Sequence, residues 1–285
     1  MKYLFPNYIY KKKILKLINQ IINYKGKYTL EREFKNKNNK KPLTNINQEL
    51  GYLFLKNEMT ISKNLLNNLE KYCNENKINE MKKKNNEKSF MINLLDEKDV
   101  TNIPGLLDYV LDDKILDLVS NYLKTIPLLA YIKIFYSLPN QTTESSQLFH
   151  CDTEDDNQIK LFFYLDDVDE NNGPFVFIPK NKSLVVMRKN KYQGKRLKDN
   201  EVYSYINPND AIKFIGEKGS GLAIDTCRCL HYGSRENKKT RKLLMVQFTN
   251  HFANLYYKSN LNKYLDYNKI EKSKHIYCKP HKRLF

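Results

Sequence analysis

The sequence predicts an α+β protein, mostly β with flanking helices, whose core is an antiparallel β-barrel or jelly roll. Two observations predict this class. After Pro127 the chain holds five short runs rich in β-branched or aromatic residues, separated by turn residues. The first half instead repeats leucine and isoleucine at helical spacing. The 285 residues, of which 41% are apolar, suffice to bury a sizeable core.

The predicted helices come first along the chain. Apolar residues at helical spacing predict a short helix within residues 11–24 with one apolar and one basic face. This helix either packs on the surface of its own domain or lies at a membrane interface. The elements expected next are a polar linker (35–41), a strand (51–55), a helix (61–73), a polar connection (74–89) and a helical stretch (104–123).

The predicted strands follow. They are expected at 128–137, 158–165, 174–179, 221–226 and 241–249. A charged insertion without a clear period, residues 187–215, interrupts them as either a lid or a surface excursion. Along the second strand, alternation separates an apolar face from a face that carries Lys160 and Tyr164. That second face looks either into the barrel or into solvent.

The net charge of +17 is concentrated at the two ends of the chain. Residues 1–44 hold twelve basic and two acidic residues, and residues 255–285 hold eight and two. The 210 residues between them are almost neutral, which argues against a nucleic-acid groove across the domain. We therefore expect a basic N-terminal extension (1–44, helix plus linker), one main domain (45–254) and a basic C-terminal segment (255–285).

Cysteine usage and hydropathy indicate a cytoplasmic protein. The five cysteines are odd in number and loosely spaced, which favours free thiols over disulfides or a zinc site. Because charged residues interrupt every apolar run, we expect neither a membrane-spanning helix nor a signal peptide.

Three residues of the second half could ligate a metal. His150 and Asp152 are two positions apart at the end of a probable strand, so their side chains project from the same face. His231 follows a later strand. Two imidazoles and one carboxylate are the ligand set of non-haem Fe(II) oxygenases, which leave three metal positions open for co-substrate and dioxygen. A histidine two residues before an aspartate also occurs by chance on protein surfaces.

Arg241 adds a group suited to a co-substrate. It begins the strand after His231, where its side chain can reach the same cavity. A guanidinium is a planar fork that matches a carboxylate, such as the distal carboxylate of 2-oxoglutarate. An arginine at a strand edge can also be purely structural.

Longer segments extend these matches. They are FHCD (149–152), the strand, acidic turn, Asn-Gly-Pro and strand of residues 158–184, the segment 219–235, and Arg241. In these segments the sequence resembles the phytanoyl-CoA dioxygenase-like family of Fe(II)- and 2-oxoglutarate-dependent oxygenases. The resemblance covers about residues 48–250. The Pro-Gly-Ser-His turn usual in the family here reads PKNKS (179–183), without the histidine.

The resemblance implies a fold, a reaction and a set of site residues. The fold would be a double-stranded β-helix, the cupin-like jelly roll. His150, Asp152 and His231 would be the catalytic metal ligands for Fe(II), and Arg241 would hold 2-oxoglutarate, with Lys160 and Tyr164 as further candidates for that co-substrate or for an anionic substrate. The enzyme would use dioxygen to hydroxylate a small-molecule substrate while 2-oxoglutarate loses carbon dioxide to give succinate. Because Asp152 is retained, a hydroxylase is favoured over a halogenase.

Other functions remain open at this point. The chain could be a non-catalytic cupin-like binding domain. The basic ends could instead direct an oxygenase to a glycolipid, a membrane-associated substrate or a nucleic acid, with peripheral membrane contact through residues 11–24. Arg228 and Arg235, which flank His231, could contact a negatively charged substrate or could simply be exposed.

Overall fold

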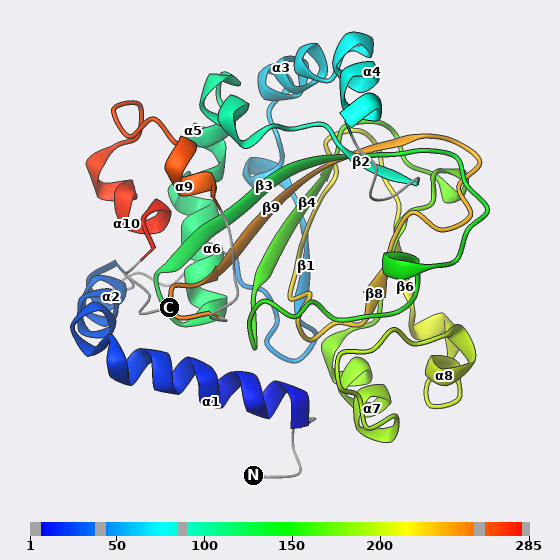
Figure 1. Ribbon diagram of the computed structural model, residues 1–285, viewed down its shortest axis with the longest axis horizontal. Helices are drawn as coiled ribbons and strands as arrows, with labels where there is room; N and C mark the ends of the chain where they lie inside the picture. The colour runs from blue at the N-terminus through cyan, green and yellow to red at the C-terminus, as the bar shows by residue number, and fades with distance from the viewer. Residues whose placement is uncertain (1–6, 38–43, 85–89, 254–259, 281–285) are drawn as a thin grey trace.

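The computed structural model describes residues 7–37, 44–84, 90–253 and 260–280. It contains two antiparallel sheets with helices packed around them (Figure 1). The predicted class of antiparallel sheets with flanking helices is confirmed, although helices occupy more of the described chain than strands do. The strands are β1 (Tyr52–Leu55), β2 (Met91–Asn93), β3 (Pro127–Ser137), β4 (Ile159–Tyr164), β5 (Phe175–Phe177), β6 (Ile212–Phe214), β7 (Gly221–Ile224), β8 (His231–Tyr232) and β9 (Arg241–Asn250).

The larger sheet has the order β1-β7-β4-β9-β3-β2 and the smaller one β6-β5-β8. Every pair of neighbouring strands is antiparallel. Alternation along β4 sends Leu161 and Phe163 to a core beneath the helices, and Phe162 and Tyr164 to a core between the sheets. The same alternation along β3 and β9 makes one face of the large sheet the inner wall of the barrel.

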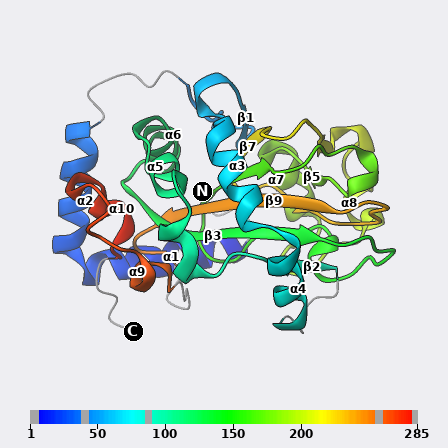
Figure 2. The ribbon, with the colours of Figure 1, turned by 90° about the horizontal axis from the view of Figure 1, so that it is seen from above.

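Helices cover the outer face of the large sheet (Figures 1 and 2). Leucines and isoleucines of α3, α5 and α6 share one apolar core with the outer residues of β3, β4 and β9. The α-helices are α1 (Asn7–Ile22), α2 (Tyr24–Lys37), α3 (Lys63–Tyr72), α4 (Glu75–Lys84), α5 (Leu106–Val110), α6 (Asp113–Leu123), α7 (Lys180–Lys189), α8 (Asp199–Tyr203), α9 (Leu261–Tyr264) and α10 (His275–Cys278).

Several predicted elements need correction. Residues 74–89, expected as a polar connection, contain helix α4, which buries none of its residues and so has no apolar period to detect. The single stretch 104–123 is two helices, because Asp112 accepts a hydrogen bond from the backbone N–H of Lys114 (2.8 Å) and caps the start of α6. Of the linker expected at 35–41, residues 35–37 end α2, and the rest lie outside the described residues.

The charged insertion 187–215 also has more structure than its sequence indicates. It contains the end of α7, helix α8 and strand β6, which pairs with β5 and completes the small sheet. Leu197 exchanges two backbone hydrogen bonds with Phe149 (3.1 and 2.8 Å), beside the predicted metal motif. The insertion is therefore part of the barrel wall.

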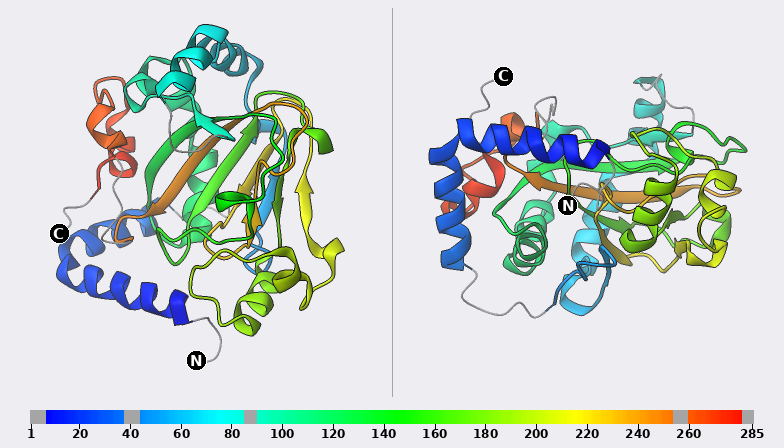
Figure 3. Two further views of the ribbon diagram at one scale, coloured as in Figure 1. Left: turned by 45° about the vertical axis from the view of Figure 1, so that its right-hand side comes forward. Right: turned by 90° about the horizontal axis from the view of Figure 1, so that it is seen from below.

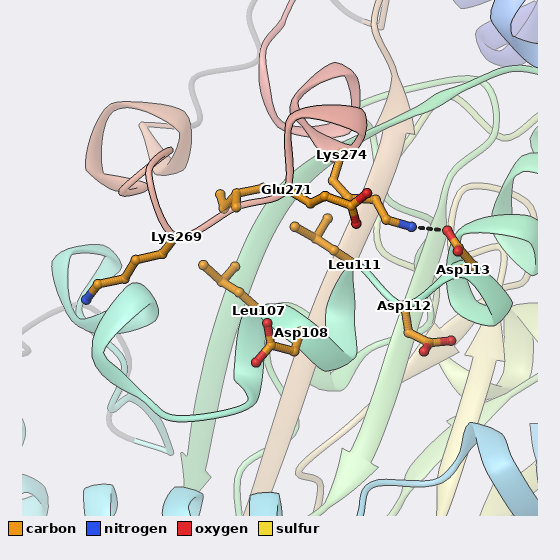
Figure 4. Close-up of a pocket in the computed structure, with 9 residues that line it drawn as sticks. Leu107, Asp108, Leu111, Asp112, Asp113, Lys269, Glu271 and Lys274 are labelled. Atoms are coloured by element: carbon orange, nitrogen blue, oxygen red, sulfur yellow. Dashed lines mark hydrogen bonds and ion pairs between the residues drawn. The ribbon is translucent and has the colours of Figure 1, made fainter.

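The C-terminal segment packs on α5 and α6 around a cavity of about 260 Å³ (Figure 4). Lys274 forms an ion pair there with Asp113. Lys37 of α2 donates a hydrogen bond to the Tyr277 hydroxyl (3.1 Å), so the N- and C-terminal segments lie side by side (Figure 3). No helix in the described part of the chain has the length and apolar character needed to cross a membrane.

Candidate metal centre

Two histidines far apart in the sequence are paired through the backbone. The N–H of His150 donates to the carbonyl of His231 (3.0 Å), and the N–H of His231 donates to the carbonyl of His150 (2.9 Å). Their imidazole centroids lie 4.3 Å apart. The distance between the two rings is thus set by the main chain of β8 and of the segment before Asp152.

Both imidazoles are held in the same way. Nδ1 of His150 lies 2.9 Å from the carbonyl oxygen of Leu148, and Nδ1 of His231 lies 2.9 Å from that of Cys229. Burial lowers the pKa of both histidines, so both rings are neutral at pH 7. A neutral ring that donates Nδ1–H to a carbonyl keeps its lone pair on Nε2, which is the arrangement of a metal ligand.

Asp152 completes the group. Its backbone N–H donates to the carbonyl of Thr226 (2.9 Å), and its Oδ1 lies 3.9 Å from Nε2 of His231. Its Oδ2 lies 2.7 Å from Nζ of Lys160. Burial opposes ionisation, but the ammonium of Lys160 holds the pKa of Asp152 below its ordinary value. Candidate ligand atoms of His150, Asp152 and His231 all lie within 4.8 Å of one another, so the three can hold a metal ion.

A chain of amides, which the sequence did not reveal, orients this carboxylate. Nε2 of Gln158 donates to Oδ2 of Asp152 (3.0 Å) and to Oγ1 of Thr226 (2.9 Å). Nε2 of Gln247 donates in turn to Oε1 of Gln158 (3.1 Å). Both glutamines are buried polar residues in otherwise apolar strand runs, which is the signal that could have identified them.

The metal-ligand candidates open into a cavity of about 340 Å³. Its walls come mainly from the inner faces of β3, β4 and β9 and from the segments that carry the histidines. Residues that line it and enter the argument are Lys133, His150, Asp152, Lys160, Arg196, His231 and Arg241. Arg196 belongs to the insertion, which therefore contributes directly to the site.

Arg241 reaches this cavity from the first position of β9 and is 2% exposed. Its Nη1 donates to the carbonyl of Gly173 (2.6 Å), and its Nη2 donates to Oγ of Ser137 (3.3 Å). Gly173 has a φ of 59°, and a Cβ there would lie 2.4 Å from Oδ1 of Asn237. A left-handed glycine therefore positions the carbonyl that fixes the guanidinium.

The two weaker candidates on β4 have different surroundings. Lys160 lines the cavity, so the polar face of this strand looks into the barrel and not into solvent. Its ammonium is paired with Asp152. Tyr164 lies between the two sheets, where its ring stacks on Phe214 at 4.3 Å between centroids and its hydroxyl donates to the Phe214 carbonyl. That hydroxyl is already committed to the backbone.

The two arginines near His231 hold parts of the fold together. Arg228 is 9% exposed and donates through Nε to the carbonyl of Asp156 (2.9 Å). Arg235 forms a two-pronged ion pair with Asp199 of α8 (2.9 and 2.8 Å) and lies 3.7 Å from the ring centroid of Tyr232. These contacts give both arginines a structural role.

The cysteines and the other two described histidines lie outside the site. All five cysteines are free and buried, in agreement with the expected thiols. His251 is fully buried, and Nε2 of His275 lies 3.1 and 3.0 Å from the carbonyl oxygens of Tyr267 and Ile270.

Helix α1 docks beside the metal motif. Nζ of Lys16 lies 2.5 Å from Oδ1 of Asp156 and 3.3 Å from Oδ1 of Asp155. Although burial alone would lower it, these carboxylates raise the pKa of Lys16 above its ordinary value. Burial raises the pKa of Asp155 to about 7. The N-terminal extension thus neutralises two buried carboxylates that follow Asp152 closely in the sequence.

A Lys16→Met variant should lose about 3 kcal/mol of unfolding free energy at pH 8, because two buried carboxylates lose their shared cation. The loss should be smaller at pH 5. The Asp155 pKa lies above its unfolded value, so its contribution to stability falls as the pH rises toward 7, and below that pH it carries a proton. Urea unfolding at both pH values measures this. Lys27→Met, which removes an exposed pair with Glu31, is the matched control and should cost under about 0.5 kcal/mol. Equal losses in both variants would contradict the role of Lys16.

Comparison with known proteins gives structural matches only. No protein-family model matches the sequence, and no curated protein matches it. Similar solved structures include EctD from S. alaskensis with 2-oxoglutarate and 5-hydroxyectoine (TM-score 0.48, 13% identity, 71% of this chain and 73% of EctD). HygX from Streptomyces hygroscopicus, with nickel and 2-oxoglutarate bound, has a TM-score of 0.47 and 12% identity over 71% of this chain and 83% of HygX.

A third similar structure is SnoK, a non-heme alpha ketoglutarate dependent carbocyclase from nogalamycin biosynthesis, with a TM-score of 0.46 and 14% identity over 72% of this chain and 81% of SnoK. The roles of this chain's residues rest on the geometry of its own site.

Proposed function

We propose that the chain is an Fe(II)- and 2-oxoglutarate-dependent oxygenase that hydroxylates a small molecule. One observation carries the proposal. His150, Asp152 and His231 converge at one end of a cavity, and each is held through its other polar atoms in the state that a metal ligand requires. Arg241 lines the same cavity.

The donor set fits ferrous iron. Two neutral imidazoles and one carboxylate form the three-residue facial set that leaves three metal positions open, whereas structural zinc sites are closed by four protein ligands. When bound, iron would take up the oxo-acid and dioxygen and oxidise the substrate as the oxo-acid loses carbon dioxide. The protein's part is to hold Nε2 of each histidine and the Asp152 carboxylate in place. The Gln247–Gln158 chain does this for the carboxylate.

The surroundings of Arg241 fit a dicarboxylate. Its guanidinium is buried, and two of its nitrogens are fixed by Gly173 and Ser137. The Tyr164 hydroxyl interacts with the guanidinium, but no carboxylate among the described residues pairs with it, so a buried positive charge is available to a bound carboxylate. We assign the distal carboxylate of 2-oxoglutarate to Arg241. Lys160, which touches Asp152, is a secondary candidate, and Tyr164 is the weakest because its hydroxyl bonds the Phe214 carbonyl.

The remaining wall favours a small anionic substrate. A volume of about 340 Å³ is within the range of small-molecule sites. Lys133 from β3 and Arg196 from the insertion also line the cavity, and neither is assigned to metal or co-substrate. Glu154 is an acidic residue on the same wall, so the two cations outnumber the acids there.

Succinate formation tests this function. Purified protein with Fe(II), 2-oxoglutarate and dioxygen should release succinate above the background rate when a library of small carboxylates and phosphates contains the substrate. Hydroxylated product should appear in equal amount to succinate. Neutral analogues of a positive compound are the matched controls. A protein that binds iron and 2-oxoglutarate tightly, yet releases no succinate with any compound, would instead be a binding domain.

A further inference from the structure

Helix α1 points its apolar face away from the protein. Six aliphatic side chains on it are between 39% and 65% exposed. They are Ile14, Leu15, Leu17, Ile18, Ile21 and Ile22. At 100° per residue, Ile14, Ile18 and Ile21 form the centre of one stripe and the other three lie along its sides. A contiguous exposed stripe of this kind marks an interaction surface more often than isolated exposed residues do.

The opposite face of α1 makes the contact with the body. Lys16 pairs with Asp155 and Asp156, and Asn19, which is 3% exposed, donates to the carbonyl of Phe252 (3.4 Å). Ordinary surface helices bury their apolar stripe and expose their polar one. Here ion pairs and a buried amide hold α1 against the body, and its six aliphatic side chains remain 39–65% exposed on a helix that lies on the outside of the molecule (Figure 3).

Basic and aromatic groups surround the stripe. Lys11 is exposed on α1 itself, and Lys25 is exposed on α2, which begins two residues after α1 ends; Tyr24 and Tyr28 of α2 are 63% and 67% exposed. Residues 1–44 carry ten more positive than negative charges. Tyrosines and lysines beside an aliphatic stripe are the composition of helices that lie in a membrane interface.

We propose that the outer face of α1 binds an anionic membrane surface, with the helix lying in the plane of the headgroups. Charge decides between this occupant and a second copy of the chain. Pairing two copies of α1 about a two-fold axis would bring like-charged lysines together, whereas anionic lipids would neutralise them. The proposal is independent of the proposed oxygenase function, and its test needs no catalytic activity.

A single reporter can follow the contact, because the chain contains no tryptophan. The indole of an Ile18→Trp variant should shift its emission to the blue, and become protected from acrylamide, when phosphatidylcholine vesicles with about one-third phosphatidylserine are added. At low salt the protein should bind pure phosphatidylcholine vesicles at least about tenfold more weakly than the anionic vesicles. Added salt should reduce this difference in affinity. No spectral change with anionic vesicles would overturn the proposal. A blue shift that grows with protein concentration in the absence of vesicles would show that the outer face of α1 binds a second copy of the chain instead.

Vesicle sedimentation of two paired variants separates the apolar and ionic contributions. Ile14→Gln with Ile21→Gln should weaken binding to anionic vesicles by at least about tenfold. Lys11→Gln with Lys25→Gln should weaken it about fivefold for each lysine, and leave binding to neutral vesicles unchanged. Tyr205→Gln with Ile215→Gln, both 43% exposed and outside α1, is the matched control and should bind like the wild type. An equal loss in the control would show that binding is not specific to α1.

Discussion

Replacing His231 with alanine is expected to lower iron affinity by more than about 100-fold and to reduce succinate release to the uncatalysed background. The variant loses one of three candidate ligands, and loss of even an outer partner of a ligand costs about 10- to 100-fold. Metal analysis after dialysis and anaerobic titration with Fe(II) measure the first effect. His231→Gln, which retains most of the side-chain volume, should show the same loss.

The matched control is His275→Asn on α10, whose Nε2 lies near the carbonyls of Tyr267 and Ile270, away from the candidate metal centre. It should keep wild-type iron content and turnover. His251→Ala is a poorer control, since His251 is fully buried and its loss is expected to cost stability. The fifth histidine of the chain, His281, lies outside the residues that the structure describes. Full iron occupancy in His231→Ala would show that His231 is not a metal ligand.

Arg241→Lys is expected to raise the KM for 2-oxoglutarate by about 10- to 100-fold while metal affinity stays near the wild-type value. Lysine retains the charge but not the planar fork, and a hydrogen bond to a charged group contributes about 1.5–3 kcal/mol. Calorimetric titration of 2-oxoglutarate, with and without metal, measures this directly. Melting curves should accompany it, because Arg241 also binds Gly173 and Ser137.

Lys160→Met is the informative partner variant. Because Nζ of Lys160 lies 2.7 Å from Oδ2 of Asp152, its loss should change metal affinity more than the KM for 2-oxoglutarate. The reverse pattern is an unchanged KM for 2-oxoglutarate in Arg241→Lys and a raised KM in Lys160→Met. It would show that Lys160, and not Arg241, binds the co-substrate.

The strands that could be predicted lie in β-branched or aromatic runs bounded by turn residues. Runs 128–137, 158–165 and 241–249 became β3, β4 and β9, and runs 51–55, 174–179 and 221–226 contain β1, β5 and β7. Alternation along 158–165 separated two faces, and the structure shows that the face with Lys160 lines the cavity. Strands β2, β6 and β8 have three, three and two residues and carry no usable alternation. Their pairing depends on residues remote in the sequence.

The candidate ligands were predictable for a different reason. The spacing of His150 and Asp152, together with the family resemblance, identified them without knowledge of their neighbours. The partners that hold them were not predictable, because Gln158, Lys160 and Gln247 act through contacts across strands. A sequence can indicate which strand carries a residue, but it does not indicate which side chain on a neighbouring strand that residue will contact.

The periodicity of helix α1 does not indicate which of its faces packs on the body. The spacing of its isoleucines predicted both a helix and an apolar face, and the helix is present at Asn7–Ile22. The apolar face is exposed because the body offers Asp155 and Asp156, whose burial requires a cation. Docking was thus decided by charges in a segment about 140 residues away.

The pairing of β3 with β9 also determines when the cavity can form during synthesis. These strands make the longest ladder of the sheet, from Pro127 opposite Asn250 to Ser137 opposite Arg241, and so close a loop of about one hundred residues. A ribosome-bound chain that has emerged only through β7 holds β3 and β4 but lacks β9, the strand that lies between them. The inner faces of β3 and β4 stay open to other chains until β9 arrives, so this interval is the stage most exposed to aggregation and to chaperones.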